Sequence, residues 1–177
     1  FRENTHIMTN VKEILSHRSA EPEDSVLYIV GTPIGNLKDI SERATNILSK
    51  VGLIACEDTR NTRKLLTCLG LSNKLTSFNE FNAKAKIPII VSELKNNNAV
   101  ALVSDAGMPL ISDPGDRLVN EVKKANFEVI TIPGPCAAIA ALICSGLPSS
   151  KFIFYGFIPK SGSERTQTLI SIKNSTF

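Results

Sequence analysis

The sequence predicts an α/β fold built on a parallel sheet. Short apolar runs alternate with segments of amphipathic helical spacing, and the connections between them are short. Three of the runs end abruptly in turns rich in Gly and Pro: LYIVGTPIGN from Leu27, AVALVSDAGMPLISDPG from Ala99 and VITIPGPCA from Val129. Because ligands of such sheets lie at the carboxyl ends of the strands, these turns predict one composite pocket.

Six strands are expected, at Val26–Val30, Leu53–Cys56, Leu75–Ser77, Val100–Val103, Val129–Ile132 and Phe152–Tyr155. Five helices are expected: one capped by Asp39 or Ser41 with an apolar face from Ile40 to Val51, one from Thr59 to about Gly70, one carrying Ile87, Ile90, Val91 and Leu94, one carrying Leu118, Val122 and Ala125, and one from Pro135 to Leu142. Pro88 is compatible only with the first turn of its helix.

Composition limits the function classes. The chain has 177 residues, a hydrophobic fraction of 42% and a net charge of +3, which is too small a basic excess to indicate nucleic-acid binding by itself. The four cysteines form no CxxC pair, and both histidines, His6 and His17, lie near the start, so we expect reduced thiols and no metal site. No apolar run reaches the roughly 18 residues of a membrane span, and no signal peptide is present.

The ends of the chain predict its organisation. Residues 1–25 are polar and mixed in charge, and we expect a flexible leader, with Met8 a possible true start. An α/β domain is expected over 26–134. Residues 135–177 are expected to begin a second domain that stops without a closing element, which indicates a fragment.

The first turn, Gly31 to Asn36, lacks the GxGxxG spacing of a nicotinamide-binding fold. Its glycines allow close approach of backbone to a ligand, although a simple tight turn explains them equally well. The third of the turns places Gly134 just before a helix whose free N–H groups suit a carboxylate.

Polar side chains follow the other strands. Glu57 and Asp58 are paired acids at a strand end, where one of them can also cap the next helix. Three cations, Arg60, Arg63 and Lys64, follow near one face of the next helix. This face either binds phosphate groups or is exposed to solvent without a binding role. No Ser-His-Asp or Cys-His set can be assembled, because no histidine follows His17.

The SFNEFN segment contributes Asn79, Glu80 and Asn82. These polar side chains either line the expected pocket or form turn and cap hydrogen bonds. Asp105 can accept hydrogen bonds from a ligand or form an Asx-turn.

Taken in order, the segments GTPIGNL, EDTR, SDAGMPLISDPG, PGPCA and LPSSKFIFYGFIP resemble the ribosomal RNA small-subunit methyltransferase I family, from about Val26 to about Ile172. That family has the tetrapyrrole-methylase-like fold of class III S-adenosylmethionine-dependent methyltransferases. The resemblance implies methyl transfer from S-adenosylmethionine, without a metal, to the ribose 2′-hydroxyl of a cytidine in small-subunit (16S) rRNA. It also implies a cytoplasmic homodimer that acts on the 30S subunit, with the cofactor in a cleft between two α/β domains. Members continue beyond the end of this chain, so we expect a C-terminal truncation.

The resemblance assigns roles to particular residues. Cofactor contacts fall on Ile34, Asp105, Gly107, Met108, Ile111, Gly134, Cys136 and Ala137. Candidates to frame and activate the acceptor ribose are Asn36, Glu57, Asp58 and Glu80, with RNA held by Arg60, Arg63 and Lys64.

Three departures from the family pattern involve four positions. Met108 stands where the family has Thr, Cys136 where it has Ser, and Asn79 and Phe81 where it has histidines. The last departure removes the easiest general-base candidates, which leaves a carboxylate or water to take the proton of the hydroxyl. Two other functions stay open: methylation of a tetrapyrrole ring, which the fold also serves, and an inactive fragment of the rRNA enzyme.

Overall fold

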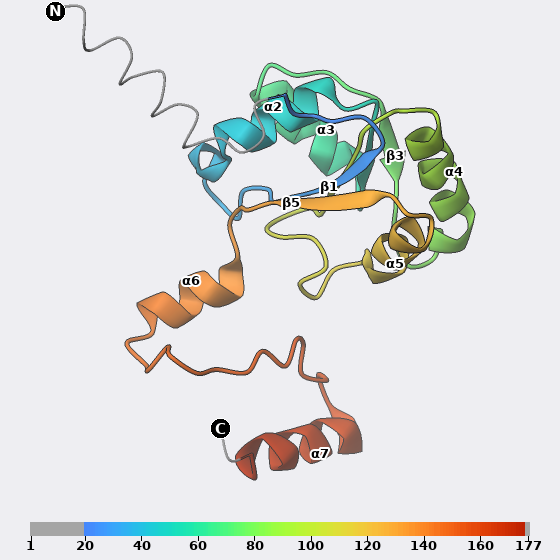
Figure 1. The fold of residues 1–177 in the computed structure, drawn as a ribbon. Coiled ribbons are helices and arrows are strands. Elements are labelled where there is room, and N and C mark those ends of the chain that lie inside the picture. The colour runs from blue at the N-terminus through green and yellow to red at the C-terminus, as the bar shows by residue number, and fades with distance from the viewer. Residues whose placement is uncertain (1–19, 176–177) are drawn as a thin grey trace, which may run out of the picture.

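The computed structural model describes residues 20–175, and a five-stranded parallel sheet forms its centre (Figure 1). The strands are β1 (Val26–Val30), β2 (Leu53–Cys56), β3 (Leu75–Ser77), β4 (Val100–Val103) and β5 (Glu128–Ile132), in the spatial order β3-β2-β4-β1-β5. Strand β1 pairs in parallel with both β4 and β5, and β2 pairs in parallel with β3 and β4. The predicted parallel-sheet α/β class is confirmed.

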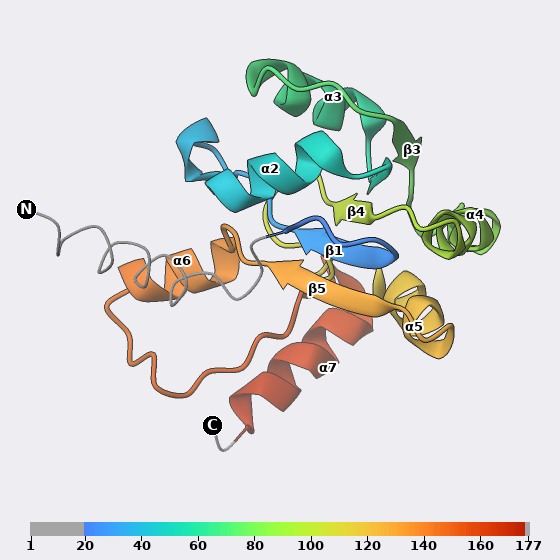
Figure 2. The ribbon, with the colours of Figure 1, turned by 45° about the horizontal axis from the view of Figure 1, so that its top comes forward.

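Helices cover both faces of the sheet (Figure 2). They are α2 (Glu42–Lys50), α3 (Thr59–Cys68), α4 (Ala83–Lys95) and α5 (Asp116–Lys124), preceded by the 3-10 turn η1 (Leu37–Asp39) and followed by α6 (Ala137–Cys144) and α7 (Gly162–Lys173). On one face Val26, Tyr28 and Val30 pack with residues of α2 and α3. On the other face Leu27 and Ile29 pack with residues of α4 and α5. Successive side chains of a strand point to opposite faces of the sheet, and helices cover both faces at β1. All five residues of β1 are therefore apolar and buried.

Most predicted boundaries agree with the structure. Ser41, rather than Asp39, caps α2, and its hydroxyl accepts the N–H of Ala44 at 3.0 Å. Strand β5 starts one residue earlier than expected, and α6 starts at Ala137 rather than at Pro135.

The prediction for Pro88 is wrong. This proline lies inside α4, beyond the first turn, instead of in it. Its ring removes the N–H that would reach the carbonyl of Lys84. Both residues are exposed, so water can satisfy that carbonyl, and the apolar face formed by Ile87, Ile90 and Leu94 holds the helix on the sheet.

The prediction of a strand at Phe152–Tyr155 is also wrong. The segment has no regular structure and all four side chains are exposed. A strand needs a neighbour for its backbone N–H and C=O groups, and within residues 20–175 no strand lies beside this segment. Helices α6 and α7 bury none of their residues, and in Figure 1 this part of the chain extends away from the sheet.

The end of the expected leader is attached to α2. The carboxylate of Glu21 accepts two hydrogen bonds of 2.6 Å from the Arg43 guanidinium, and the side chain of Asn46 donates to the Glu21 carbonyl at 3.2 Å. The N–H of Glu23 donates to the hydroxyl of Tyr28 at 2.8 Å. The rest of the expected leader, residues 1–19, lies outside the described residues.

Two neighbouring isoleucines of α4 test this packing. Ile90 is 0% exposed and Ile89 is 49% exposed. We expect Ile90→Ala to lower the free energy of unfolding by about 2–5 kcal/mol, because it removes buried methyl groups and leaves a cavity. Ile89→Ala, the matched control, should change it by no more than about 0.5 kcal/mol. Urea denaturation of both variants measures the difference, and equal losses would contradict the assignment of the buried face.

Candidate functional site

The loops that follow β1 and β4 are joined through their backbones. The N–H of Thr32 donates to the carbonyl of Gly107 at 2.9 Å, and the N–H of Gly107 donates to the carbonyl of Thr32 at 3.1 Å. The buried hydroxyl of Thr32 also donates to the carbonyl of Ser104 at 3.2 Å. These bonds fix the first loop against the end of β4.

The loops that follow β1 and β5 touch through two glycines. A Cβ atom placed on Gly31 would lie 2.7 Å from Cα of Gly134 and 2.6 Å from the sulfur of Met108. A Cβ atom placed on Gly134 would lie 2.8 Å from Cα of Gly31. Real side chains do not approach this closely, so both positions require glycine for this contact to form.

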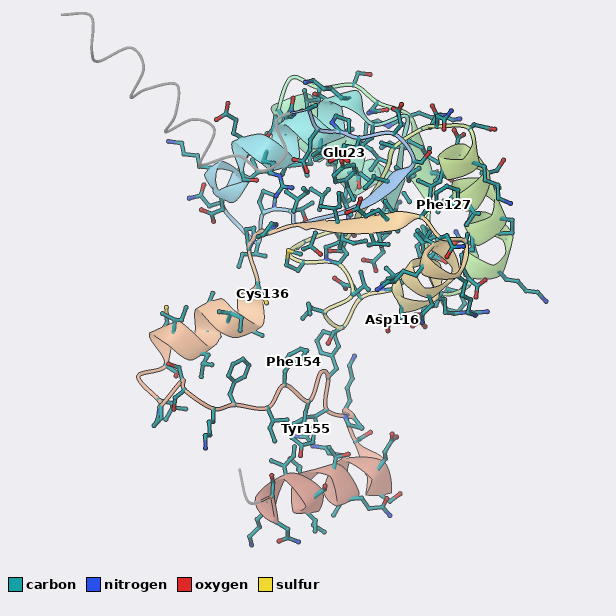
Figure 3. The ribbon with its side chains drawn as sticks, viewed as in Figure 1. Glu23, Asp116, Phe127, Cys136, Phe154 and Tyr155 are labelled. Carbon is teal, nitrogen blue, oxygen red and sulfur yellow. The ribbon has the colours of Figure 1, made fainter. Side chains whose placement is uncertain are left out.

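A cavity of about 310 Å³ lies where these loops meet, within the size range of ligand sites. Six residues assigned to the cofactor line it: Ile34, Gly107, Met108, Ile111, Cys136 and Ala137. In Figure 3, Cys136 lies at the head of α6 and Phe154 on the segment that runs below that helix in this view. The predicted composite pocket is therefore present, and it is largely apolar.

Two residues assigned to the cofactor do not line the cavity. Gly134 supports it through the contact with Gly31. The carboxylate of Asp105 accepts the N–H of Asp58 at 3.2 Å and the side-chain amide of Asn61 at 2.7 Å. Asp105 therefore connects the end of β4 to the start of α3.

The loop between β4 and α5 has an unusual backbone. Gly107, Leu110, Ser112 and Gly115 all have positive φ, at 83°, 72°, 63° and 152°. Leu and Ser adopt the left-handed region rarely, and such strain is typical of functional loops. Ile111 and Ser112, both exposed, line the cavity from this loop.

Carboxylates gather at the ends of β2 and β4. Burial raises the pKa of Glu57, and the nearby charges of Asp105, Asp113 and Asp58 raise it further. Burial likewise raises the pKa of Asp113, and the charge of Asp105 adds to it while a hydrogen bond with Ser104 opposes it. A carboxylate with a raised pKa is a better proton acceptor near neutral pH.

Two of the other candidates for the acceptor ribose, Asn36 and Asp58, have structural partners. The side chain of Asn36 accepts the N–H of Lys38 at 3.1 Å and caps η1. The side chain of Asp58 caps α3 through the N–H of Arg60 at 2.8 Å and pairs with the Arg60 guanidinium at 2.6 Å. Glu80 lines a second cavity with Asp113.

The three cations of α3 differ from one another. Arg60 is paired with Asp58, and that pairing and the capping bond lower the pKa of Asp58 to about 2. Arg63 and Lys64 are exposed, and no ion pair is found for either among residues 20–175. The described residues contain no group of three or more His, Cys, Asp or Glu placed to hold a metal ion, and none of their helices is long and apolar enough to cross a membrane.

Sequence reasoning missed part of the cavity wall. The additional lining residues are Ala106, Ser112, Asp113, Ala138, Phe154, Gly156 and Phe157. Asp113 is the informative one, since it lies in the same SDPG segment whose Gly and Pro residues drew attention to the loop. Phe154 was not assigned to the cavity because its segment was predicted to be a strand.

Comparison with known proteins identifies the family. Residues 26–171 match the model of the tetrapyrrole (corrin/porphyrin) methylases. The chain belongs to this family. Its methylase relatives include proteins named ribosomal RNA small subunit methyltransferase I, from Vibrio cholerae (48% identity, covering 83% of this chain and 51% of the relative) and from Thermotoga maritima (52% identity, 83% and 66%). The chain thus spans about half to two thirds of the length of these relatives.

Solved methylase structures share the fold. The uroporphyrin-III C-methyltransferase of Thermus thermophilus aligns with a TM-score of 0.53 at 18% identity, over 70% of this chain and 53% of that one. A cobalt-precorrin-4 methyltransferase aligns with a TM-score of 0.56 at 15% identity, over 68% and 50%. At these identities the likeness concerns the fold alone.

The raised pKa of Glu57 predicts a pH-dependent effect on stability. In the folded protein the charged form is disfavoured, so the wild type loses stability as pH rises from the ordinary value of 4.5 through the higher folded value. We expect Glu57→Gln, which does not titrate, to gain stability relative to wild type over that window. Denaturant unfolding measured from acid to neutral pH tests this, and a difference that is independent of pH would contradict it.

Asp58→Asn is the control with the opposite sign. The folded pKa of Asp58 is lowered from 3.8 to about 2, so its contribution is present above the ordinary value and is lost as pH falls through the folded one. This variant should therefore be less stable than wild type at neutral pH and should approach it near pH 2.

Proposed function

We propose that this chain is the S-adenosylmethionine-binding part of an rRNA methyltransferase that methylates the ribose 2′-hydroxyl of a cytidine in small-subunit rRNA. The observation that carries the proposal is the convergence of the loops after β1, β4 and β5 on one cavity, lined by six of the residues assigned to the cofactor. The names of the relatives support the rRNA substrate, and the cytidine 2′-hydroxyl rests on the family resemblance.

The proposal includes the organisation implied by the resemblance. Residues 26–134 would form the methylase domain and residues 135–177 the start of a second domain. The enzyme would act on the 30S subunit in the cytoplasm, as a homodimer.

The cavity suits the chemical groups of S-adenosylmethionine. Ile34, Met108 and Ile111 offer an apolar wall for the adenine ring. The Asp113 carboxylate complements a positive charge. Helix α6 begins at this cavity with no side-chain hydrogen bond at its cap, so its first N–H groups can receive a carboxylate.

Positioning would supply most of the catalysis. S-adenosylmethionine brings a methyl group on a sulfonium, and when the ribose oxygen bonds to this methyl carbon the C–S pair of electrons remains on sulfur. The chain must hold the hydroxyl in line and receive its proton. Glu57 is the best supported acceptor among the candidates, because Asn36 and Asp58 serve as caps and because its pKa is raised.

The alternatives have less support. Methylation of a tetrapyrrole would rest on a fold likeness at 15–18% identity, whereas the relatives at 45–52% identity carry the rRNA name. An inactive fragment would fail the following binding test even where the full-length protein passes it.

Binding of S-adenosylmethionine to Gly107→Val is the test of the cavity. Gly107 has a φ of +83°, and its Cβ would lie 3.3 Å from Ile34 and 3.4 Å from the carbonyl oxygen of Pro135. We expect calorimetry to detect binding by the full-length protein, and Gly107→Val in that protein to lose at least about tenfold in affinity, or 1.4 kcal/mol. This chain alone should bind weakly or not at all, because the resemblance places the cofactor in a cleft between two domains.

Gly70→Val is the matched control. Gly70 has a similar φ of +70° with no atom near its Cβ, so it shares the backbone strain and leaves the cavity open. Equal losses in both variants would assign the effect to strain. No binding by the full-length protein would overturn the proposal.

The exposed cations of α3 are the proposed RNA contacts. Because phosphate contacts release counterions, Arg63→Ala should weaken RNA binding and reduce the slope of log affinity against log salt by about 0.7 for a single strand. Filter binding across a salt series measures this. An unchanged slope in Arg63→Ala would show that α3 does not face RNA.

In the active full-length protein, Glu57→Gln should instead lower the rate of methyl transfer with RNA affinity nearly kept.

A further inference from the structure

A second cavity opens at the same edge of the sheet. Its volume is about 460 Å³, and it lies between the turn that leads from β3 into α4 and the segment that begins α5. Asp113 lines both this cavity and the first one. The two cavities therefore share one lining residue, so a donor in one and an acceptor in the other would lie close together.

An exposed aromatic ring stands on the wall of the second cavity. Phe81 is 99% exposed, yet its turn is held in place by reciprocal bonds. The N–H of Asn79 donates to the side chain of Asn82 at 2.9 Å, and the N–H of Asn82 donates to the side chain of Asn79 at 3.1 Å. The Asn82 amide also donates to the hydroxyl and the carbonyl of Ser77, at 3.2 and 3.3 Å. Because the backbone of this turn is already held, a planar ligand that stacks on the exposed ring orders only the Phe81 side chain.

The charges of this cavity select the kind of ligand. Glu80, Asp113 and Asp116 supply three carboxylates, and Arg117 supplies one guanidinium. This excess of negative charge disfavours a phosphate inside the cavity. Carboxylates do accept hydrogen bonds from the amino groups of bases, as they do from cytosine N4.

We propose that the second cavity is a nucleoside subsite for single-stranded RNA, with an unpaired base stacked on Phe81. The amino edge of the base faces the carboxylates, and the ribose lies toward Asp113, where the two cavities meet. Unpaired bases are commonly bound by stacking on aromatic side chains in this way. This inference rests on the proposed function, whose acceptor it places.

A single tryptophan can report on this contact. The chain contains no Trp, so Phe81→Trp carries one indole at the proposed platform. Stacking of a base on an indole quenches its fluorescence. We expect a short oligocytidylate to quench Phe81→Trp, and an abasic oligomer of the same length to leave it unchanged.

Phe152→Trp is the matched control. Phe152 is 52% exposed and lines neither cavity, so its indole should not be quenched. Equal quenching in both variants, or none in Phe81→Trp, would overturn the subsite.

Affinity provides a second readout. Phe81→Ala should weaken oligocytidylate binding by about fivefold or more, because it removes the stacking contact, and Phe81→Trp should keep the affinity. Oligouridylate, which has a carbonyl in place of the amino group, should bind more weakly, and equal affinity for both oligomers would overturn the carboxylate contact. S-adenosylmethionine binding, measured separately, distinguishes the two ideas: a chain that binds the cofactor but shows no quenching keeps the proposed function and loses this subsite.

Discussion

The contact between Gly31 and Gly134 is the constraint on which the site depends. The two backbones approach so closely that a Cβ on either residue would fall within 2.8 Å of the other. This contact continues past the last paired residues of β1 and β5, and the Thr32–Gly107 bridge continues the β1–β4 pairing on the other side. The strand pairing thus extends into the loops, and these backbone contacts fix the wall of the cavity that the loops after β1, β4 and β5 form.

A group of carboxylates lies at the edge of the sheet, beside this apolar cavity. Glu57 and Asp113 each lie near the charge of Asp105 and are partly shielded from water, and both carry a raised pKa. The cluster is tolerated because Asp105 receives two hydrogen bonds from the start of α3 and Asp58 is neutralised by Arg60. Repulsion thus remains on Asp113, which lines both cavities, and on the nearby Glu57, and it raises the pKa of both carboxyl groups.

Sequence reasoning located β1, β2 and β4 because they are short apolar runs that a parallel sheet buries on both faces. It also located the edge strands β3 and β5, which are only partly buried. It located most of the cofactor cavity because turns at strand ends need Gly and Pro. The Phe152–Tyr155 prediction failed because β propensity describes a residue's fit to a sheet that must already exist beside it. Asp113 was not predicted as a site residue because its role depends on lining two cavities, and a local sequence pattern does not indicate this.

The C-terminal segment gives the first cavity a different kind of wall. Phe154, Gly156 and Phe157 line it, yet Phe157 remains 88% exposed and the helices on either side bury no residue. The contact of this segment with the loop before α5 is close, since a Cβ on Gly156 would lie 3.3 Å from the hydroxyl of Ser112. One wall is therefore fixed by the sheet, and the other is held by few contacts. A ligand that touches both walls stabilises the second against local opening, so binding and ordering of this segment are thermodynamically linked.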